Sequence, residues 1–230
     1  MRNTLISAVA GAAILASSSA FAGAIGPTQY LQFAGSDLDG LSFTWFHLEN
    51  FEDGLLDTPG VTAPFGSPIG PGGLIDSVDE DDGVVDGNGN GGKSFFDGNG
   101  QRGITFIFDE ITLGSLPTHA GVVWTDGSGN THFEAFDGLG NSLGTIGPAA
   151  IAQGGINGET DEDHFFGWMD AGGIGSIRIY NTAGGIEVDH LQYGLENSAP
   201  VPVPAPLAMM AGGLVLAGIG AARRKRQAAA

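Results

Sequence analysis

Glycine occupies 41 of the 230 positions and recurs so closely that few stretches are long enough for a helix. Between residues 28 and 196, apolar and polar residues alternate in short runs that Gly, Asp, Asn or Pro separates. No stretch in this range combines an apolar period of 3.6 residues with helix caps. Runs at a spacing of about 8–12 residues are typical of antiparallel strands joined by turns. The sequence therefore predicts an all-β fold, and we expect one jelly-roll-like β-sandwich over residues 23–196.

The alternating runs place the expected strands along the chain. Strands are expected at residues 42–48, 104–108, 122–124, 131–136, 177–180 and 186–193. The sequence Asp-Gly-Ser-Gly-Asn at 126–130 predicts a hairpin loop between two of them. Gly184 and Gly185 are expected to join the last two strands.

The charge of the chain is strongly negative, with 26 acidic and 8 basic residues and a net charge of −18. All the acidic residues lie between Arg2 and Arg223, and the only cations among them are Lys93, Arg102 and Arg178. Such a surface repels phosphate backbones, so we expect no nucleic-acid partner. The chain has no cysteine, so its stability must come from its core, from metal ions or from both.

The N-terminus has the pattern of a signal peptide over residues 1–22. Arg2 is the positive residue at the start, and an apolar run from Leu5 to Leu15 follows. Ala20 and Ala22 then occupy the −3 and −1 positions of an Ala-x-Ala cleavage site. We therefore expect export, with Gly23 as the new N-terminus.

The C-terminus has three parts in a fixed order. Residues 197–206 form a Pro-rich linker, and sixteen uncharged residues follow at 207–222. A helix of that length spans about 24 Å, somewhat less than a hydrocarbon core of about 30 Å, and flanking arginines can extend its reach. The basic tail at 223–230 begins with a membrane-stop cluster of Arg223, Arg224, Lys225 and Arg226. We expect one transmembrane helix with this tail in the cytoplasm.

This order resembles the PEP-CTERM sorting tail of exopolysaccharide-producing Gram-negative bacteria. The family motif is Val-Pro-Glu-Pro, and this chain has Val203, Pro204, Ala205 and Pro206, with Ala in place of Glu. The Ala-Met-Met run at 208–210 and the basic cluster also match. The resemblance implies an exosortase-type processing enzyme as partner. It also implies a precursor that is exported across the inner membrane, anchored there, and then placed at the cell surface or in the extracellular matrix.

The central region is similar to the uncharacterised ectodomain of a set of PEP-CTERM proteins. The similar segments are residues 46–54, 76–79, 113–121, 123–126 and 185–193. That set has no assigned activity, so the resemblance supplies relatives without supplying a function.

The densest group of acids precedes the sequence Gly-Asn-Gly-Asn-Gly-Gly at 87–92. Its candidate ligands are Asp76, Asp79, Asp81, Asp82 and Asp86. Crowded carboxylates repel one another unless a cation lies among them, and calcium binds six to eight oxygens. The spacing departs from an EF-hand, because with Asp79 as the first position of the loop, Gly83 falls at the fifth position instead of the sixth. A calcium site and a solvated acidic loop are both consistent with this sequence.

A second candidate site joins distant parts of the chain, with Glu52 and Asp53 near an early strand and Asp189 in the last one. The segment Phe-Glu-Asp-Gly at 51–54 and Asp189 resemble the pattern with which many jelly-roll carbohydrate-binding modules hold a structural calcium ion. The resemblance implies Ca²⁺ as a cofactor. The alternative is that these acids belong to turns and to the surface.

Other candidate residues favour structural roles. The sequence Asp-Glu-Asp-His at 161–164 is expected to be a charged turn that enters a buried strand, with a cation site or a sugar-contacting rim as the alternative. Trp45, Trp124 and Trp168 are expected in the core rather than in a sugar-binding surface. The five histidines lack the spacing of a zinc site.

We therefore expect a calcium-stabilised surface or matrix protein that binds extracellular polysaccharide and is not an enzyme. A polysaccharide-degrading enzyme, either a glycoside hydrolase or a lyase, is the first alternative and needs a groove with two carboxylates. Ice binding is a lesser alternative, because the chain lacks any Thr-x-Thr sequence.

Overall fold

The computed structural model of the chain describes residues 22–152 and 158–197. Within these ranges, no helix has both the length and the apolar character needed to cross a membrane. Ala20 of the predicted cleavage site, the predicted sorting motif, the helix expected at 207–222 and the basic cluster lie outside the described residues. The first strand begins at Ala22, immediately at the predicted cleavage site.

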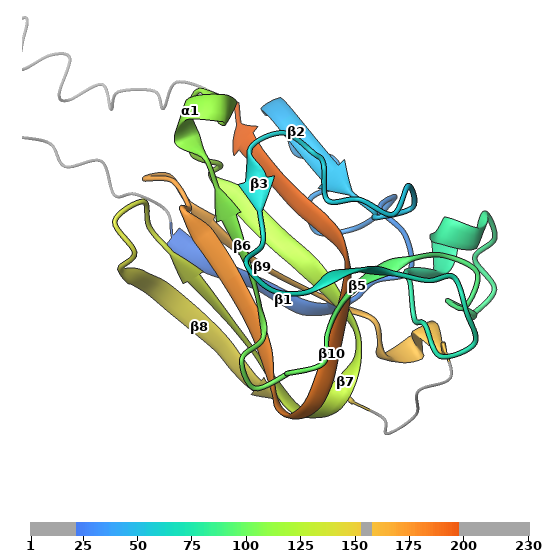
Figure 1. The fold of residues 1–230 in the computed structure, drawn as a ribbon. Coiled ribbons are helices and arrows are strands. Elements are labelled where there is room, and N and C mark those ends of the chain that lie inside the picture. The colour runs from blue at the N-terminus through green and yellow to red at the C-terminus, as the bar shows by residue number, and fades with distance from the viewer. Residues whose placement is uncertain (1–21, 153–157, 198–230) are drawn as a thin grey trace, which may run out of the picture. The chain divides into compact units, whose positions relative to one another are not determined.

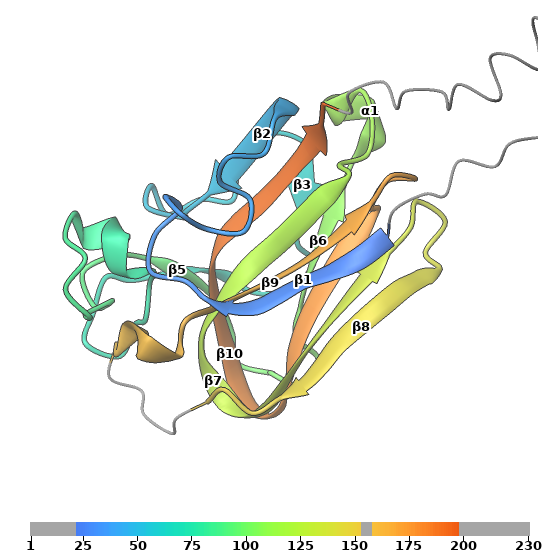
Figure 2. The same cartoon turned by 180° about the vertical axis from the view of Figure 1, so that it is seen from behind.

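The described residues are mostly β-strand, which confirms the all-β prediction (Figures 1 and 2). The strands are β1 (Ala22–Gln29), β2 (Phe43–Glu49), β3 (Val61–Thr62), β4 (Ser67–Ile69), β5 (Ser94–Asp97), β6 (Ile104–Phe108), β7 (His119–Phe136), β8 (Ser142–Ala149), β9 (His164–Asp170) and β10 (Ser176–Glu196). The helices are α1 (Glu110–Leu113) and the 3₁₀ helices η1 (Asp79–Asp82) and η2 (Thr160–Glu162). All ten strands belong to one antiparallel sheet.

Two long strands, β7 and β10, organise the sheet. They pair with each other along most of their length, from Ser176 opposite Phe136 to Gly194 opposite His119. The first half of β10 also pairs with β6, and its second half pairs with β5 and β2. The first half of β7 pairs with β9, and its second half pairs with β8. Each half of the long pair therefore has its own neighbours, and the register shifts between the halves.

The hairpin predicted at residues 126–130 is wrong. These residues lie inside β7, and Gly184 and Gly185 lie inside β10, so each pair of expected strands is one long strand. The register between β7 and β10 shifts three times across this region, from Asn181 to Val188. Gly and Asp serve β-bulges as well as turns, because a bulge also bends the backbone and leaves residues unpaired. The residue types that predict a hairpin loop here mark a bend in a continuous pair of strands.

The core contains side chains from both halves of the long β7–β10 pair and from the strands beside them. Its largest side chains with essentially no exposure include Trp124, Phe106, Phe133 and Tyr193. Trp168 is also buried, which agrees with its expected core role, and Trp45 is half-buried against the same core.

A smaller apolar cluster lies beside this core and fixes the acidic loop. It consists of Tyr30, Leu38, Val78, Val123 and Phe165. Val78 has no exposed surface and immediately precedes η1. The acidic loop is therefore anchored on the protein by a buried apolar side chain rather than held out in solvent.

Candidate cation centre

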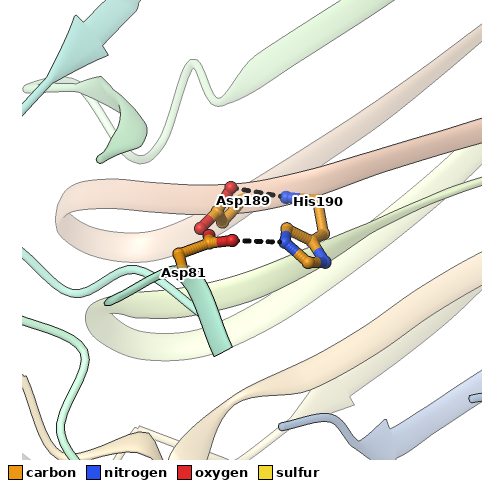
Figure 3. A group of neighbouring side chains, drawn as sticks. All are labelled: Asp81, Asp189 and His190. Atoms are coloured by element: carbon orange, nitrogen blue, oxygen red, sulfur yellow. Dashed lines mark hydrogen bonds and ion pairs between the residues drawn. The ribbon is translucent and has the colours of Figure 1, made fainter. Parts of the chain in front are cut away.

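Three potential ligands from two distant segments meet beside η1 (Figure 3). Ligand atoms of Asp81, Asp189 and His190 all lie within 4.8 Å of one another. Asp189 is fully buried, and the side chains of Asp81 and His190 are 4% and 2% exposed. The two candidate sites inferred separately from the sequence, the acidic loop and the last strand, therefore meet in one place.

A bulge in β10 presents the adjacent residues Asp189 and His190 to the same site. The register advances from Asp189 opposite Val123 to Gln192 opposite Gly121, so β10 contains one extra residue here. His190 adopts a left-handed backbone with φ of 40°, which is uncommon outside glycine and costs energy. In a regular strand, adjacent side chains would point to opposite faces of the sheet.

Backbone hydrogen bonds hold the acidic loop in the shape that directs Asp81 inward. The Val78 N–H donates to Asp189 Oδ2 at 2.9 Å, which ties the loop to β10. Asp79 accepts hydrogen bonds from the backbone N–H groups of Asp86, Gly87 and Asn88 at 3.0–3.3 Å. Asp79 therefore stabilises the loop by accepting these hydrogen bonds. The sequence predicts Asp79 as a metal ligand and does not reveal this structural role.

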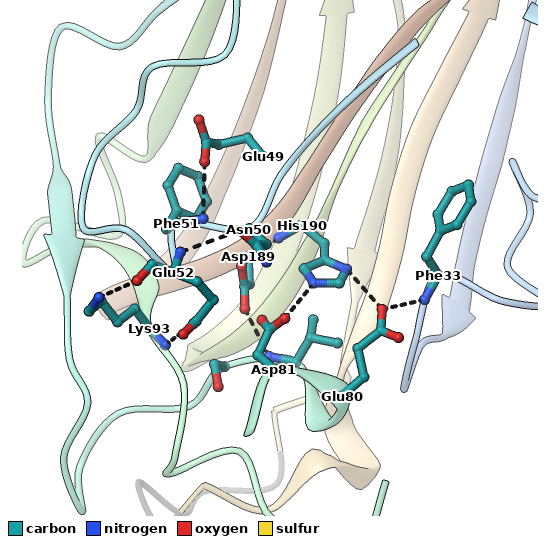
Figure 4. A network of polar contacts seen from close by, with 12 residues as sticks. Phe33, Glu49, Asn50, Phe51, Glu52, Glu80, Asp81, Lys93, Asp189 and His190 are labelled. Carbon is teal, nitrogen blue, oxygen red and sulfur yellow. Dashed lines mark hydrogen bonds and ion pairs between the residues drawn. The ribbon is translucent and has the colours of Figure 1, made fainter. Parts of the chain in front are cut away.

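Glu52 approaches the same site from the turn after β2 (Figure 4). Its Oε1 accepts a hydrogen bond from the Lys93 backbone N–H. A Cβ atom at Gly92 would lie 2.8 Å from Asp81 Cβ and 2.9 Å from Glu52 Oε1. Gly92 therefore permits Asp81 and Glu52 to converge, because a larger residue would push them apart.

Among the described residues, no Lys or Arg forms an ion pair with a carboxylate of this centre, and the basic side chain that contacts Asp81 is His190. The Lys93 Nζ donates to the Glu52 backbone carbonyl, Arg102 pairs with Asp97 at 2.7 Å, and Arg178 donates to backbone carbonyls. Burial, and then the charge of Asp81, raise the pKa of Asp189. Burial is also the main cause of a raised pKa at Glu52, with the charge of Asp81 adding to it. A cation would stabilise these groups in their ionised form.

His190 fixes the orientation of Asp81. Its Nε2 lies 3.0 Å from Asp81 Oδ1, and its Nδ1 lies 2.9 Å from the Tyr30 hydroxyl. Since both ring nitrogens have partners, the oxygens of Glu52, Asp81 and Asp189 are the atoms that would bind a cation. Asp81 Oδ2 is buried without a hydrogen-bond donor, so it has a coordination position to offer. Oxygen ligands of this kind fit calcium, and a hydrogen-bonded second layer of residues is common around metal ligands.

The other predicted ligands lie elsewhere. Asp53, Asp82 and Asp86 are exposed, and Asp53 and Asp82 accept hydrogen bonds from backbone N–H groups two residues ahead. Asp76 is buried, and the strongest charge effect on its pKa comes from Glu187 rather than from Asp81. The structure therefore brings Asp81 and Asp189 together, with Glu52 near Asp81, and places Asp76 in a separate acidic group.

A hollow of about 210 Å³ lies on the surface near the middle of β10. Phe96, which is 37% exposed, lines it together with Asp126 and Glu187. Glu187 lies directly opposite Asp126 in the paired strands. Burial raises the pKa of Glu187 to about 7, and the charge of Asp126 contributes to the rise.

We predict that calcium stabilises the protein more as the pH rises. Burial raises the pKa of Asp76 to about 9 and that of Glu187 to about 7, from ordinary values of 3.8 and 4.5. A carboxyl group with a raised folded-state pKa binds its proton more firmly when folded. It therefore stabilises the fold in acid, and this stability is lost as the pH rises through that interval.

In excess chelator, Tm should consequently fall between about pH 5 and about pH 8, because over this range the folded state holds protons on these groups that the unfolded state has already lost. Burial also raises the pKa of Asp189 in the cation centre, so calcium competes with a proton there and the calcium-induced rise in Tm should grow with pH. Thermal unfolding at both pH values, with chelator and with calcium, measures both trends. A calcium effect of equal size at the two pH values would contradict the prediction.

Comparison of the chain with protein-family models, with curated proteins and with solved structures finds no match in any of the three.

Proposed function

We propose that this chain is an exported cell-surface or matrix protein whose calcium-stabilised β-domain binds extracellular polysaccharide without cleaving it. The observation that carries the proposal is the convergence of Asp81 and Asp189 from two distant segments, with Glu52 near Asp81. A site assembled only in the folded chain stabilises that fold when it binds a cation. Extracellular fluid supplies calcium. A chain without cysteine cannot be stabilised by a disulfide instead.

We infer that the sheet is a jelly-roll-like sandwich folded over along β7 and β10. The separate neighbours of the two halves of this pair, and the apolar core that contains side chains from both halves, support this interpretation. Antiparallel sandwiches of this kind present loops at their ends. Ligands of such domains therefore meet loops carried on a rigid sheet.

The hollow at Phe96 is the proposed polysaccharide site. The partly exposed Phe96 ring offers an apolar face to a sugar ring. Asp126 and Glu187, which are 6% and 4% exposed, line the hollow, and in each of them the oxygen that is not already bonded within the protein could accept a hydrogen bond from a sugar hydroxyl group. By contrast, the ring of Phe65, which is 48% exposed, is covered by the Arg102 guanidinium at 3.9 Å from its centroid. Phe65 therefore provides a matched control for Phe96.

Export and anchoring follow from the predicted ends of the chain. On this proposal, the N-terminal signal directs the domain across the inner membrane. The C-terminal helix and basic cluster then hold the precursor until an exosortase-type enzyme processes it. Polysaccharide binding would retain the processed protein at the cell surface or in the matrix.

Polysaccharide cleavage is the second candidate function, and one observation favours it. Glycosidases that retain configuration use two carboxyl groups about 5–5.5 Å apart, one of them an acid with a raised pKa. Glu187 and Asp126 are cross-strand partners, and the pKa of Glu187 is raised to about 7. Against this function, the Asp76 N–H and the Ser94 hydroxyl both donate to Glu187 Oε1, so this oxygen is already bonded within the protein.

We predict that Phe96→Ala weakens polysaccharide binding at least about tenfold, the equivalent of about 1.4 kcal/mol. Phe65→Ala should leave binding within about twofold, because the Phe65 ring is covered by Arg102. Binding of the full chain to the exopolysaccharide of its host can be measured by microscale thermophoresis, with calcium present.

The same incubation tests for cleavage by measuring reducing ends. We expect none above background, and Glu187→Gln should not change this result. Reducing ends that form with the unaltered chain and disappear in Glu187→Gln would establish the enzyme and refute the binding-only proposal. Equal binding by the two Phe variants would refute the assignment of the hollow.

A further inference from the structure

A second group of buried oxygens lies where the acidic loop meets the segment before β9. The Gly89 N–H donates to the Gly158 carbonyl at 2.9 Å, and Asn88 forms a β-bridge with Glu159. Both segments lie at the same end of the sheet in Figures 1 and 2, with η1 in green-blue and η2 in orange. This junction is separate from the Asp81–Asp189 centre.

Asp163 lies at this junction with an unsatisfied side chain. It has no exposed surface, and neither of its carboxylate oxygens has a hydrogen-bond partner. Only its backbone is engaged, with the carbonyl accepting from the Tyr30 N–H at 2.9 Å. A buried carboxylate without donors is among the most unfavourable groups in a folded protein, so something must compensate it.

Two further side-chain oxygens at the junction are also buried without a hydrogen-bond partner. Asp76 Oδ1 and Thr160 Oγ1 are buried and lack hydrogen-bond partners, and their residues are 2% and 1% exposed. Asp76 Oδ1 lies over Gly89, only 2.6 Å from where a Cβ atom at that position would stand. With the two oxygens of Asp163, four buried oxygens from two segments lack a donor.

The surroundings of Asp163 supply negative charge. Burial raises its pKa well above the ordinary value, and the charges of Asp76, Glu162, Asp79 and Asp161 raise it further. The described part of the chain contains Lys93, Arg102 and Arg178 as its only Lys or Arg residues, and all three bind elsewhere. Within the described ranges, no Lys or Arg side chain therefore compensates the acids of the junction.

We propose that Asp76, Thr160 and Asp163 bind a second calcium ion, separate from the one at Asp81 and Asp189. All four ligand atoms are oxygens. Calcium binds oxygen ligands, whereas zinc prefers nitrogen and sulfur, so the set favours calcium. Water and neighbouring acids would complete the six to eight oxygens that calcium takes. This inference goes beyond the proposed function and does not depend on polysaccharide binding.

The ion would tie the segment at 158–163 to the acidic loop. A hollow of about 570 Å³ adjoins the junction and is lined by Asp79, Asp86, Glu159, Thr160 and Asp161 among others. Its acidic lining attracts cations, and Thr160 belongs both to the hollow and to the site. The hollow therefore gives calcium a route from solvent to the buried oxygens.

The test is Asp163→Asn in the full chain, purified in mild detergent and freed of metal. The exchange keeps the shape of the side chain and removes its charge. In chelator the variant should melt above the unaltered chain, because Asn needs neither a proton nor a cation in order to be buried. In millimolar calcium it should melt below the unaltered chain, because a ligand is lost. Asp82 is an exposed acid of the same loop, so Asp82→Asn should change Tm neither in chelator nor in calcium.

Equilibrium dialysis against radioactive calcium counts the ions directly. We expect two ions on the unaltered chain, one on Asp163→Asn and one on Asp189→Asn, with none on the double variant. Thr160→Val removes a ligand without changing charge, so it should weaken one site and serves if Asp163→Asn does not fold.

A single ion on the unaltered chain would overturn the proposal. Unchanged stoichiometry in Asp163→Asn, with a Tm equal to the unaltered chain in calcium, would show that Asp163 is a protonated core residue and also overturn it. Loss of an ion only in Asp189→Asn would leave the proposed function intact and remove this second site.

Discussion

Removal of calcium by a chelator is expected to lower Tm by roughly 5–11 °C at neutral pH. The estimate takes calcium at about one hundred times the dissociation constant of the Asp81–Asp189 centre, which contributes about 2.7 kcal/mol of stability. For a domain of this size, each kcal/mol moves Tm by about 2–4 °C. Magnesium should have much less effect, because it retains its waters and demands a tighter octahedral geometry.

Variants at the centre connect this effect to particular residues. Asp189→Asn should abolish most of the calcium-induced rise in Tm that depends on this centre. Gly92→Ala should reduce it, because the added Cβ pushes against Asp81 and Glu52. Gly73→Ala is the matched control, since a Cβ at that position meets nothing within 4 Å. Equal melting temperatures in chelator and in millimolar calcium would refute every calcium site in this account.

Trp124→Ala is expected to destabilise the protein by about 3–5 kcal/mol, because it removes a large, fully buried side chain from β7. The change also removes the hydrogen bond from Trp124 Nε1 to Asn181 Oδ1, which is 3.0 Å long and crosses from β7 to β10. Together these losses correspond to a fall in Tm of roughly 6–20 °C.

Chemical denaturation in millimolar calcium measures the free energy of unfolding with the metal sites kept occupied. Leu139→Ala is the control, because that side chain is 90% exposed and should contribute less than about 0.5 kcal/mol. If Trp124→Ala were as mild as Leu139→Ala, the long β7–β10 pair would not be the centre of the core.

The alternation of apolar and polar residues, together with turn residues, predicts correctly those strands that end at a turn. The run at 104–108 is β6, residue for residue, because its alternation of core and exposed side chains is regular. The same reasoning failed at 126–130, where Gly and Asp residues bend a long strand instead of ending it. Alternation and turn chemistry describe local backbone geometry, and the pairing of β7 with β10 decides between a bulge and a loop.

The sequence predicts which residues are ligands of the cation centre, but it does not predict that they belong to one site. Asp81 and Asp189 were both candidate ligands, yet they belonged to different predicted sites, because 108 positions separate them and only the fold brings them together. Gly92 and His190 carried no signal that would have marked them, since their roles depend on close packing and on a bulge.

Asp163 was expected in a charged turn, and the structure buries it completely. A sequence of three acids before a buried strand does not reveal which acid points inward. The one available signal was its position directly before the apolar run of β9, beginning Phe-Phe-Gly-Trp after His164. The location of Asp163 beside Asp76 follows from the contact between two loops, which no local pattern encodes.

The most direct test of the central claim is a crystal structure of the protein grown in calcium, with anomalous scattering recorded at a long wavelength. The account predicts an anomalous peak among Glu52, Asp81 and Asp189, with oxygen ligands at about 2.3–2.6 Å. Absence of a peak there, with Asp81 and Asp189 joined by a short carboxyl–carboxylate hydrogen bond, would contradict it.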